Sequence, residues 1–166
     1  MSVRPFDWRD LLVLYRYRNR YVYLDTTRFL TQGPTFAPVR SIFSSLTPAF
    51  IPTTGVYTYQ SKDDGSLPQV ILGQATHVAG SPSAHLAFLA PETAIESPGL
   101  FPILEQLTCE VGSRGAYHLI AEVNEEAPAF EALRKAGFAI YARQQIWRLS
   151  GEPRKEGIIS TWKSGT

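Results

Sequence analysis

The side chains that could remove a proton from a substrate are few in this chain. A general base is usually a carboxylate or an imidazole within hydrogen-bond reach of the reacting group, and the candidates are Glu92, Glu122 and His118. Glu92 stands at the end of an apolar run of strand type, whereas a solvated surface carboxylate is the simpler interpretation of Glu122. The sequence therefore offers groups for acid–base chemistry but does not choose among them.

Other catalytic chemistries have no matching pattern. His77, His85 and His118 have no ligand spacing to one another or to Cys109, so we expect no metal site. Cys109 is the only cysteine and falls inside a predicted helix, where an ordinary helix residue is a simpler interpretation than a nucleophile. Neither a Walker phosphate loop nor a G-x-S-x-G elbow occurs.

The elements that would position these groups lie between residues 97 and 149. Five apolar residues recur at helical spacing over 99–112 and predict an amphipathic helix there; they are Leu100, Ile103, Leu104, Leu107 and Val111. Glycines at 112 and 115 would end this helix, and the apolar run 117–123 predicts a short strand after it.

A second helix is predicted to begin at 124–126. Its shared face would carry Ala127, Phe130 and Leu133. Gly137 would close this helix at the C′ position, and the β-branched and aromatic residues over 138–149 predict a long strand. The predicted order is helix, strand, helix, strand.

That order resembles the C-terminal half of the GNAT superfamily, the acyl-CoA-dependent N-acyltransferases. The matching residues are Asn124, Ala127, Phe130 and the run Leu133-Arg-Lys-Ala-Gly137-Phe138, which is similar to the family's N…A…(Y)xxxGF ending. Upstream, 70–78 and 85–92 resemble the two family strands that precede the long helix. The resemblance covers about residues 55–149, with a first strand and helix at 2–18.

The resemblance implies an α+β (mixed α/β) fold with a central mixed, mostly antiparallel sheet flanked by helices. It also implies an N-acetyltransferase, in which an amine of unknown identity attacks acetyl-CoA directly. In this family a strand edge bonds the pantetheine arm of coenzyme A, and a glycine-rich turn at a helix N-terminus holds the pyrophosphate. The cofactor-binding residues would then be Phe88, Leu89, Ala90, Gly99, Leu100 and Asn124, and the catalytic residues would be Glu92 and Tyr141.

Two positions of the family pattern hold other residues. The turn written Q/R-x-x-G-x-G/A corresponds to Glu96-Ser-Pro-Gly99-Leu-Phe101, so Glu96 would repel phosphate and Phe101 replaces a small residue. Pro98 and Pro102 also remove backbone donors from this turn. We therefore expect coenzyme A to bind weakly.

The second departure concerns the tyrosine that protonates the leaving thiolate in the family. Its position holds Leu133, so Tyr141 or Tyr117 would have to replace it, although each is more simply a strand residue. The alternative to an active enzyme is therefore a catalytically inactive GNAT-fold domain that serves as a binding or structural module, as one half of a tandem protein. The oligomeric state is left open, a dimer included.

The composition indicates a globular protein. The chain has 166 residues, 44% apolar and 19% charged, and we expect residues 1–150 to form one domain. No apolar run reaches the roughly 18–20 residues that a membrane span needs, and no signal peptide opens the chain. Together with the single cysteine, this predicts a cytoplasmic protein without a membrane partner.

The net charge of +1 is unevenly distributed. Residues 1–40 hold seven arginines and three aspartates, so +4, and the remainder holds nine basic and twelve acidic residues, so −3. Arginines alternate with tyrosines over 15–23, a pattern that can bind an acidic partner or single-stranded nucleic acid. The near-neutral total and the lack of an RNA-binding motif argue against a nucleic-acid partner.

The N-terminal half is predicted to form an antiparallel meander after an initial strand and helix. Residues 2–6 predict an edge strand, because Pro5 is tolerated only at an edge or an end. Asp7 would cap the next helix, with Asp10 at the acid position of a capping box. That helix would bury Trp8, Leu11, Leu12 and Tyr15 on one face. The further predictions are a loop over 33–52 with a short helix near 41–46, strands at 56–60, 70–78 and 85–90, and an Asp-Gly turn at 62–66.

Two predictions concern the connections. The helix at 99–112 is a crossover, so the strands at 85–90 and 117–123 should run parallel and splay apart at one end. Residues 151–166 would be a linker or tail, in which 158–162 predicts a strand that completes this sheet or begins a further domain.

Overall fold

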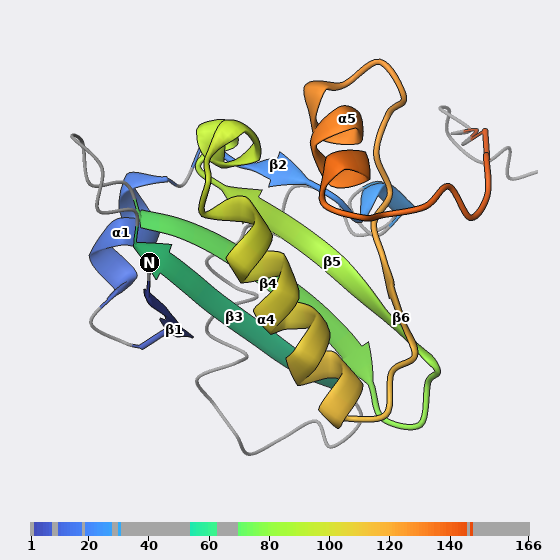
Figure 1. Cartoon of the computed structure of the whole chain (residues 1–166), viewed down its shortest axis with the longest axis horizontal. Helices are drawn as coiled ribbons and strands as arrows, with labels where there is room; N and C mark the ends of the chain where they lie inside the picture. The colour runs from blue at the N-terminus through green and yellow to red at the C-terminus, as the bar shows by residue number, and fades with distance from the viewer. Residues whose placement is uncertain are drawn as a thin grey trace, which may run out of the picture.

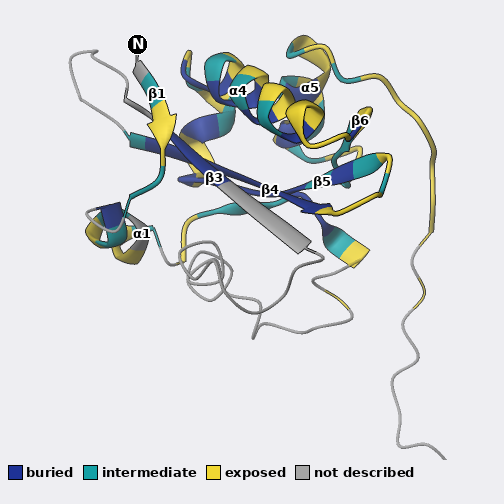
Figure 2. Cartoon of the chain, turned by 90° about the horizontal axis from the view of Figure 1, so that it is seen from below, coloured by how far each residue is buried: buried dark blue, intermediate teal, exposed yellow. Residues whose placement is uncertain are grey.

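The computed structural model describes residues 2–7, 10–17, 19–27, 30, 54–62, 70–145 and 147. Its elements run in this order: β1 (Ser2–Pro5), α1 (Leu11–Arg16), β2 (Val22–Tyr23), β3 (Thr54–Lys62), β4 (Val70–Val78), β5 (Ser83–Ala90), the 3-10 helix η2 (Glu92–Glu96), α4 (Leu100–Ser113), β6 (His118–Ile120) and α5 (Pro128–Lys135). They form an α+β fold built on a six-stranded, mostly antiparallel sheet (Figure 1). α4 and α5 lie on one face of the sheet and α1 lies on the other (Figure 2). The predicted fold class is confirmed.

The strands lie in the order β1-β3-β4-β5-β2, and β6 also pairs with β5. β3 and β4 are antiparallel along their whole length, from Thr54 opposite Val78 to Lys62 opposite Val70. β1 is the outer strand on its side, which is where Pro5 is tolerated because it has no N–H to give to a further neighbour. The predicted strands are confirmed at 2–6, 56–60, 70–78 and 85–90, the last of them beginning two residues earlier, at Ser83.

α4 is the crossover that makes β6 parallel to β5. Its five predicted core residues are all buried against the sheet: Leu100, Ile103, Leu104, Leu107 and Val111. In the parallel register, Ser83 lies opposite His118 and His85 lies opposite Ile120. Both the helix and the parallel pairing were predicted from the sequence, and both are confirmed.

α4 packs closely over Gly73 in β4. A Cβ atom at Gly73 would lie 3.1 Å from Cδ1 of Leu107 and 3.3 Å from both Cδ1 of Ile103 and Cδ2 of Leu89. Contacts this short are rare in a packed core, so the missing side chain is what lets these three apolar residues close over β4. The core beneath α4 is therefore fitted closely around one glycine.

The C-terminal half of α4 is tied to β3 by a polar bridge. The hydroxyl of Tyr59 donates a 2.8 Å hydrogen bond to the carboxylate of Glu110, which also pairs with Arg114 at 3.1 Å. Burial and the bond to Glu110 raise the pKa of Tyr59, because both disfavour a phenolate beside a carboxylate. The tyrosine is held in its neutral form, in which it can donate.

α1 begins with the predicted capping arrangement. The N–H of Asp7 donates to the carboxylate of Asp10 at 2.9 Å, and Arg4 binds the same carboxylate through two bonds of 2.7 and 2.9 Å. The carboxylate thus satisfies a backbone donor at the start of the helix and ties the helix to β1.

The predicted apolar face of α1 is partly wrong. Leu11 packs against the apolar cluster on this side of the sheet, but Leu12 and Tyr15 are exposed, at 81% and 64%. The side of α1 that meets the sheet also carries Val13, and Tyr17 follows it just after the helix. A helix of six residues makes fewer than two turns, so it presents too short a stripe for spacing to identify its buried side.

α5 ends as predicted, in a Schellman motif at Gly137. Gly137 has φ +100°, its N–H donates to the carbonyl of Arg134, and the N–H of Phe138 donates to the carbonyl of Leu133, both at 3.0 Å. Phe138 then packs against the core beneath α4. Glycine is favoured here because other residues rarely adopt this backbone conformation.

The start of α5 and its buried face differ from the prediction. The helix begins at Pro128, because Asn124 first forms a turn in which its side-chain oxygen accepts the N–H of Glu126 at 3.0 Å. Proline then takes the first turn, where its missing N–H costs nothing. The buried residues of α5 are Ala129 and Leu133, so the predicted face is displaced toward Ala129.

Two strand predictions in this half are also corrected. β6 covers 118–120 instead of 117–123, because the chain leaves β5 after Ile120. The strand predicted over 138–149 is wrong: residues 138–145 and 147 have no strand, and 139–145 are exposed. β-propensity reflects how side chains fit a half-buried pleated surface, and these residues meet no such surface. The predictions for 33–52, for the turn beyond Lys62 and for 158–162 lie outside the described residues.

Candidate functional site

The strands β5 and β6 separate after three paired residues, as the sequence predicts. In the parallel register, Ala87 would be level with Glu122, but Leu24 lies between them. The N–H of Leu24 donates to the carbonyl of Ala87 at 3.0 Å, and its carbonyl accepts the N–H of Glu122 at 2.7 Å. We call the space between the diverging strands the wedge; it is filled by the domain's own chain.

β2 occupies the outer edge of β5 next to the wedge. Val22 lies opposite Leu89 and Tyr23 lies opposite Phe88 in an antiparallel register. On its other edge β5 pairs with β4, where Leu89 faces Gly73. Both edges of β5 are therefore in use at these positions.

The pairing of β5 with β4 is irregular next to this point. Phe88 lies opposite Gln74 and Leu86 lies opposite Ala75, so Ala87 is the extra residue of a β-bulge. The bulged residue is the one whose carbonyl bonds Leu24. The bulge therefore directs this carbonyl into the wedge.

Glu122 holds the chain beyond Leu24 through its side chain. One carboxylate oxygen accepts the N–H of Thr27 at 2.7 Å and the other accepts the Thr27 hydroxyl at 3.0 Å. The Thr26 hydroxyl donates to the Glu122 carbonyl at 3.4 Å. Residues 26 and 27 are helical, so the carboxylate caps a helical turn. A solvated surface carboxylate, the simpler interpretation of the sequence, does not describe this residue.

Two tyrosine rings pack where β2 meets β5. The hydroxyl of Tyr23 donates to that of Tyr21 at 2.9 Å, and the rings meet edge to face with their centres 4.6 Å apart. The ring of Tyr21 also lies edge to face with Phe88, at 6.4 Å between centres. Burial and the bond to Tyr21 raise the pKa of Tyr23 far above its ordinary value, so Tyr23 stays protonated. These contacts hold β2 against the sheet.

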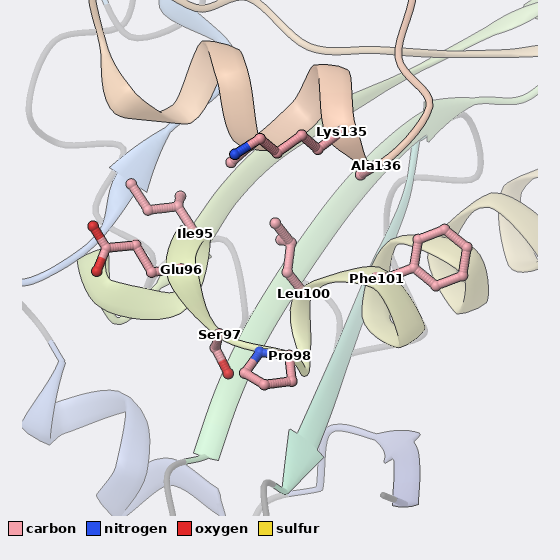
Figure 3. A pocket seen from close by; sticks show the side chains of 9 residues that line it. Ile95, Glu96, Ser97, Pro98, Leu100, Phe101, Lys135 and Ala136 are labelled. Carbon is pink, nitrogen blue, oxygen red and sulfur yellow. The ribbon is translucent and has the colours of Figure 1, made fainter.

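A shallow groove of about 320 Å³ lies between the start of α4 and α5 (Figure 3). Its lining residues are Ile95, Glu96, Ser97, Pro98, Leu100, Phe101, Ala132, Lys135 and Ala136. Glu96 and Phe101, which the resemblance would place in a phosphate-binding turn, both line it. The groove is mostly apolar and carries one charge of each sign.

The backbone donors at the start of α4 are largely used. The N–H of Gly99 donates to the Ser97 hydroxyl at 3.2 Å, and that of Leu100 donates to the Ser97 carbonyl at 3.0 Å. Pro98 and Pro102 have no N–H to donate. A phosphate at this turn would therefore find few free donors.

The structure brings together some of the residues that the resemblance assigns to the cofactor. Phe88, Leu89 and Ala90 are buried in β5, at 1% exposure or less. Gly99 and Leu100 are buried at the start of α4, beside the groove, whereas Asn124 is exposed in the turn before α5. Apart from Asn124, the proposed cofactor residues therefore lie in β5 and at the start of α4.

The two predicted catalytic residues lie away from the wedge. Glu92 is the first residue of η2 and is exposed. Tyr141 follows α5 and is 92% exposed. Neither makes a hydrogen bond with the residues that fill the wedge.

Coenzyme A does not fit the residues assigned to it in this arrangement. The edge of β5 that would bond its pantetheine arm is paired with β2, and Leu24 fills the wedge. The start of α4, where the pyrophosphate would lie, has lost donors to Ser97 and to two prolines. The chain's own contacts at β5, in the wedge and at the start of α4 therefore occupy the groups that coenzyme A would need.

The sequence did not predict that Leu24 fills the wedge or that Glu122 binds the chain that follows it. Thr27 and Glu122 are 95 positions apart, and β2 is two residues long, so no local period could reveal their pairing. The nearest signal was Thr26-Thr27, whose residue types favour the start of a helix.

Among the described residues, no group of three His, Cys, Asp or Glu side chains could hold a metal ion. The helices in this described part include none that is long and apolar enough to cross a membrane. Comparison of the chain with protein-family models, with curated proteins and with solved structures gave no match. The functional argument therefore depends on the geometry of the wedge and of the groove.

Proposed function

We propose that this chain is a GNAT-like domain that serves as a binding or structural module and does not transfer acetyl groups. The observation that carries the proposal is the pairing of β2 with β5. Phe88 and Leu89, whose backbone would hold a pantetheine arm, already have a strand of the same chain beside them. A ligand that needs these groups must first displace that strand.

Two further observations support a non-catalytic role. Leu133, which stands in the position of the family's proton donor, is buried in the core and cannot donate. Tyr141, the suggested replacement, is almost fully exposed on the chain beyond α5. The leaving thiolate of an acyl-CoA would therefore lack a partner at both positions.

The second candidate is an N-acetyltransferase that uses acetyl-CoA and an amine, and the groove favours it. The groove lies at the start of α4, carries the ammonium group of Lys135, and reaches the lower end of the volume range of small-molecule sites. This activity would require the segment in the wedge to move away. Acetyl-CoA is thus the ligand that separates the two candidates.

Calorimetric titration of the full chain with acetyl-CoA tests the proposal. A module closed at β5 should show no binding with a dissociation constant below about 1 mM, which corresponds to roughly −4 kcal/mol. A parallel assay with a panel of primary amines should release no free thiol from acetyl-CoA. Micromolar binding together with thiol release would overturn the proposal and favour the acetyltransferase.

A further inference from the structure

We propose that residues 22–27 form an intramolecular plug that excludes an amide-bearing chain from the edge of β5, and that Glu122 is the positioning residue that keeps it there. This inference goes beyond the proposed function, since it names what closes β5 and what would open it.

The plug is bound by β5 on one side and by Glu122 on the other, and its residue Leu24 is buried in the apolar core. Toward β5 it makes two residue pairs, Val22 with Leu89 and Tyr23 with Phe88, and the bond from Leu24 to Ala87. On the far side, the backbone N–H and both carboxylate oxygens of Glu122 bind it. Removing this one side chain therefore takes two hydrogen bonds from the end of the plug without touching the sheet.

Within the plug, β2 makes fewer residue pairs than any other strand of the described sheet. Two residue pairs join β2 to β5, whereas nine join β3 to β4. Leu24 is fully buried, but Thr27 is exposed and is ordered by its bonds to Glu122. A short segment with few residue pairs opens locally at lower free energy than the long central strands.

What the plug covers indicates the ligand that it excludes. The plug covers the strand edge formed by Ala87, Phe88 and Leu89 of β5. The amide groups of its extended backbone pair with the backbone of these residues. A linear ligand with amide groups spaced along it would make the same kind of bonds. The pantetheine arm of coenzyme A has this chemistry, so plug and arm compete for one edge.

The test separates the arm of coenzyme A from its phosphate-bearing head. S-acetylpantetheine is the probe for the wedge, and ADP is the probe for the groove at the start of α4. The variants are Glu122→Ala, which removes the carboxylate, and Glu122→Gln, which keeps one acceptor oxygen. Glu126→Gln is the matched control, because Glu126 is exposed in the same connection and its side chain makes no hydrogen bond or ion pair among the described residues.

Two measurements are made on each variant in the full chain. Amide hydrogen exchange at Leu24 reports whether the plug opens, with Leu107 in α4 as the internal reference for an intact fold. Calorimetry then gives the affinity for each probe. If Glu122→Ala does not fold, Thr27→Val replaces it, since this change removes the hydroxyl donor and leaves the backbone N–H bond to the carboxylate.

The expected result is a graded opening. Exchange at Leu24 should rise about tenfold in Glu122→Ala and less in Glu122→Gln, while exchange at Leu107 should stay much slower than at Leu24. The dissociation constant for S-acetylpantetheine should fall by about the same factor, because apparent affinity scales with the fraction of open molecules. Affinity for ADP and both readouts in Glu126→Gln should stay at their original values.

Three results would overturn the plug. Unchanged exchange at Leu24 in both Glu122 variants would show that Glu122 does not hold the segment. Faster exchange without any gain in affinity for S-acetylpantetheine would show that β2 is an ordinary structural strand, and the proposed module function would stand. Binding of S-acetylpantetheine by the unmodified chain as tightly as by Glu122→Ala would reject the plug, and only micromolar binding of acetyl-CoA with turnover would reject the module as well.

Discussion

The face of the sheet beneath α4 and the wedge between β5 and β6 are held together by different interactions. Beneath α4, apolar side chains pack so closely over Gly73 that a Cβ atom there would lie 3.1–3.3 Å from three of them. In the wedge, residues 22–27 are bound by backbone groups and one carboxylate, and Leu24 is the one among them that is fully buried in the apolar core. Apolar contacts stabilise a core wherever the area is buried, whereas hydrogen bonds stabilise little unless each partner is present. The core beneath α4 should therefore determine the global free energy of unfolding. The contacts in the wedge should determine whether the edge of β5 is open to a ligand.

The largest expected effect is in the core beneath α4. Leu107→Ala removes a fully buried side chain that contacts the Gly73 region, and it should lower the free energy of unfolding by about 2–5 kcal/mol. Urea denaturation measures this loss. The exposed neighbour Glu105→Ala is the control and should change stability by less than about 0.5 kcal/mol. If Leu107→Ala lowered the free energy of unfolding by less than about 1 kcal/mol, α4 would have to shift toward β4 and fill the cavity that the substitution leaves.

Glu122→Ala should be less destabilising than Leu107→Ala. It removes two accepted hydrogen bonds at Thr27, worth about 1–3 kcal/mol together, and leaves the core intact. Because the two sites share no partner, the double variant should show the sum of the single losses to within about 0.5 kcal/mol. A clear departure from additivity would contradict the distinction between the two regions.

Two tyrosines sharpen the comparison through pH. The folded-state pKa of Tyr59 beneath α4 and of Tyr23 in the wedge both lie above the unfolded value near 10. The folded state then binds more protons than the unfolded state above pH 10, so stability falls as pH rises through that range. Tyr59→Phe should cost about 1 kcal/mol at neutral pH, from the lost bond to Glu110, and should flatten the alkaline decline.

Tyr23→Phe should flatten the alkaline decline further, since burial and the hydrogen bond to Tyr21 raise the pKa of Tyr23 strongly. Urea denaturation at several values of pH between 8 and about 11 gives both curves. Stability that does not depend on pH above 10 in the unmodified chain would contradict the raised pKa of both tyrosines.

The smallest expected effect concerns the turn before α4. Glu96→Arg with Phe101→Gly removes the repulsive charge and the bulk at the groove, which offers roughly 1–2 kcal/mol toward a phosphate. ADP should bind somewhat more tightly, and the gain should shrink at high salt because the contact is screened. The affinity for acetyl-CoA should rise fully only when this double substitution is combined with Glu122→Ala, since the plug otherwise excludes the pantetheine arm from the wedge. An equal rise in the affinity for acetyl-CoA without Glu122→Ala would show that the pantetheine arm does not bind in the wedge.

The elements that were predictable are those with a local signal. α4 followed from the spacing of five apolar residues, the Schellman ending of α5 followed from Gly137, and the capping of α1 followed from Asp7 and Asp10. Each of these signals lies within a few residues of the structure that it specifies. The parallel, splayed pairing of β5 with β6 also followed, because a crossover helix allows few alternatives.

The parts that were not predictable depend on distant partners. β2 has two residues, and its position is decided by β5 and by Glu122, which lie more than 60 positions away. The strand expected over 138–149 had suitable residue types but met no surface to cover. For the site, the assignment of Phe88 to Leu100 to a cofactor depends on the family resemblance and stays a prediction, and nothing in the sequence predicts the occupation of the wedge.

The separation of 95 positions between Thr27 and Glu122 has a consequence for the order of folding. Bringing distant residues together costs more chain entropy than forming the β3–β4 pair or packing α4 on β4, so the wedge should close after the rest of the sheet. Interactions that form after the rate-limiting step affect the rate of unfolding and leave the rate of folding nearly unchanged. In stopped-flow experiments, Glu122→Ala should therefore speed unfolding, while Leu107→Ala should also slow folding. The strand that closes the domain would then be the last to arrive and the first to leave.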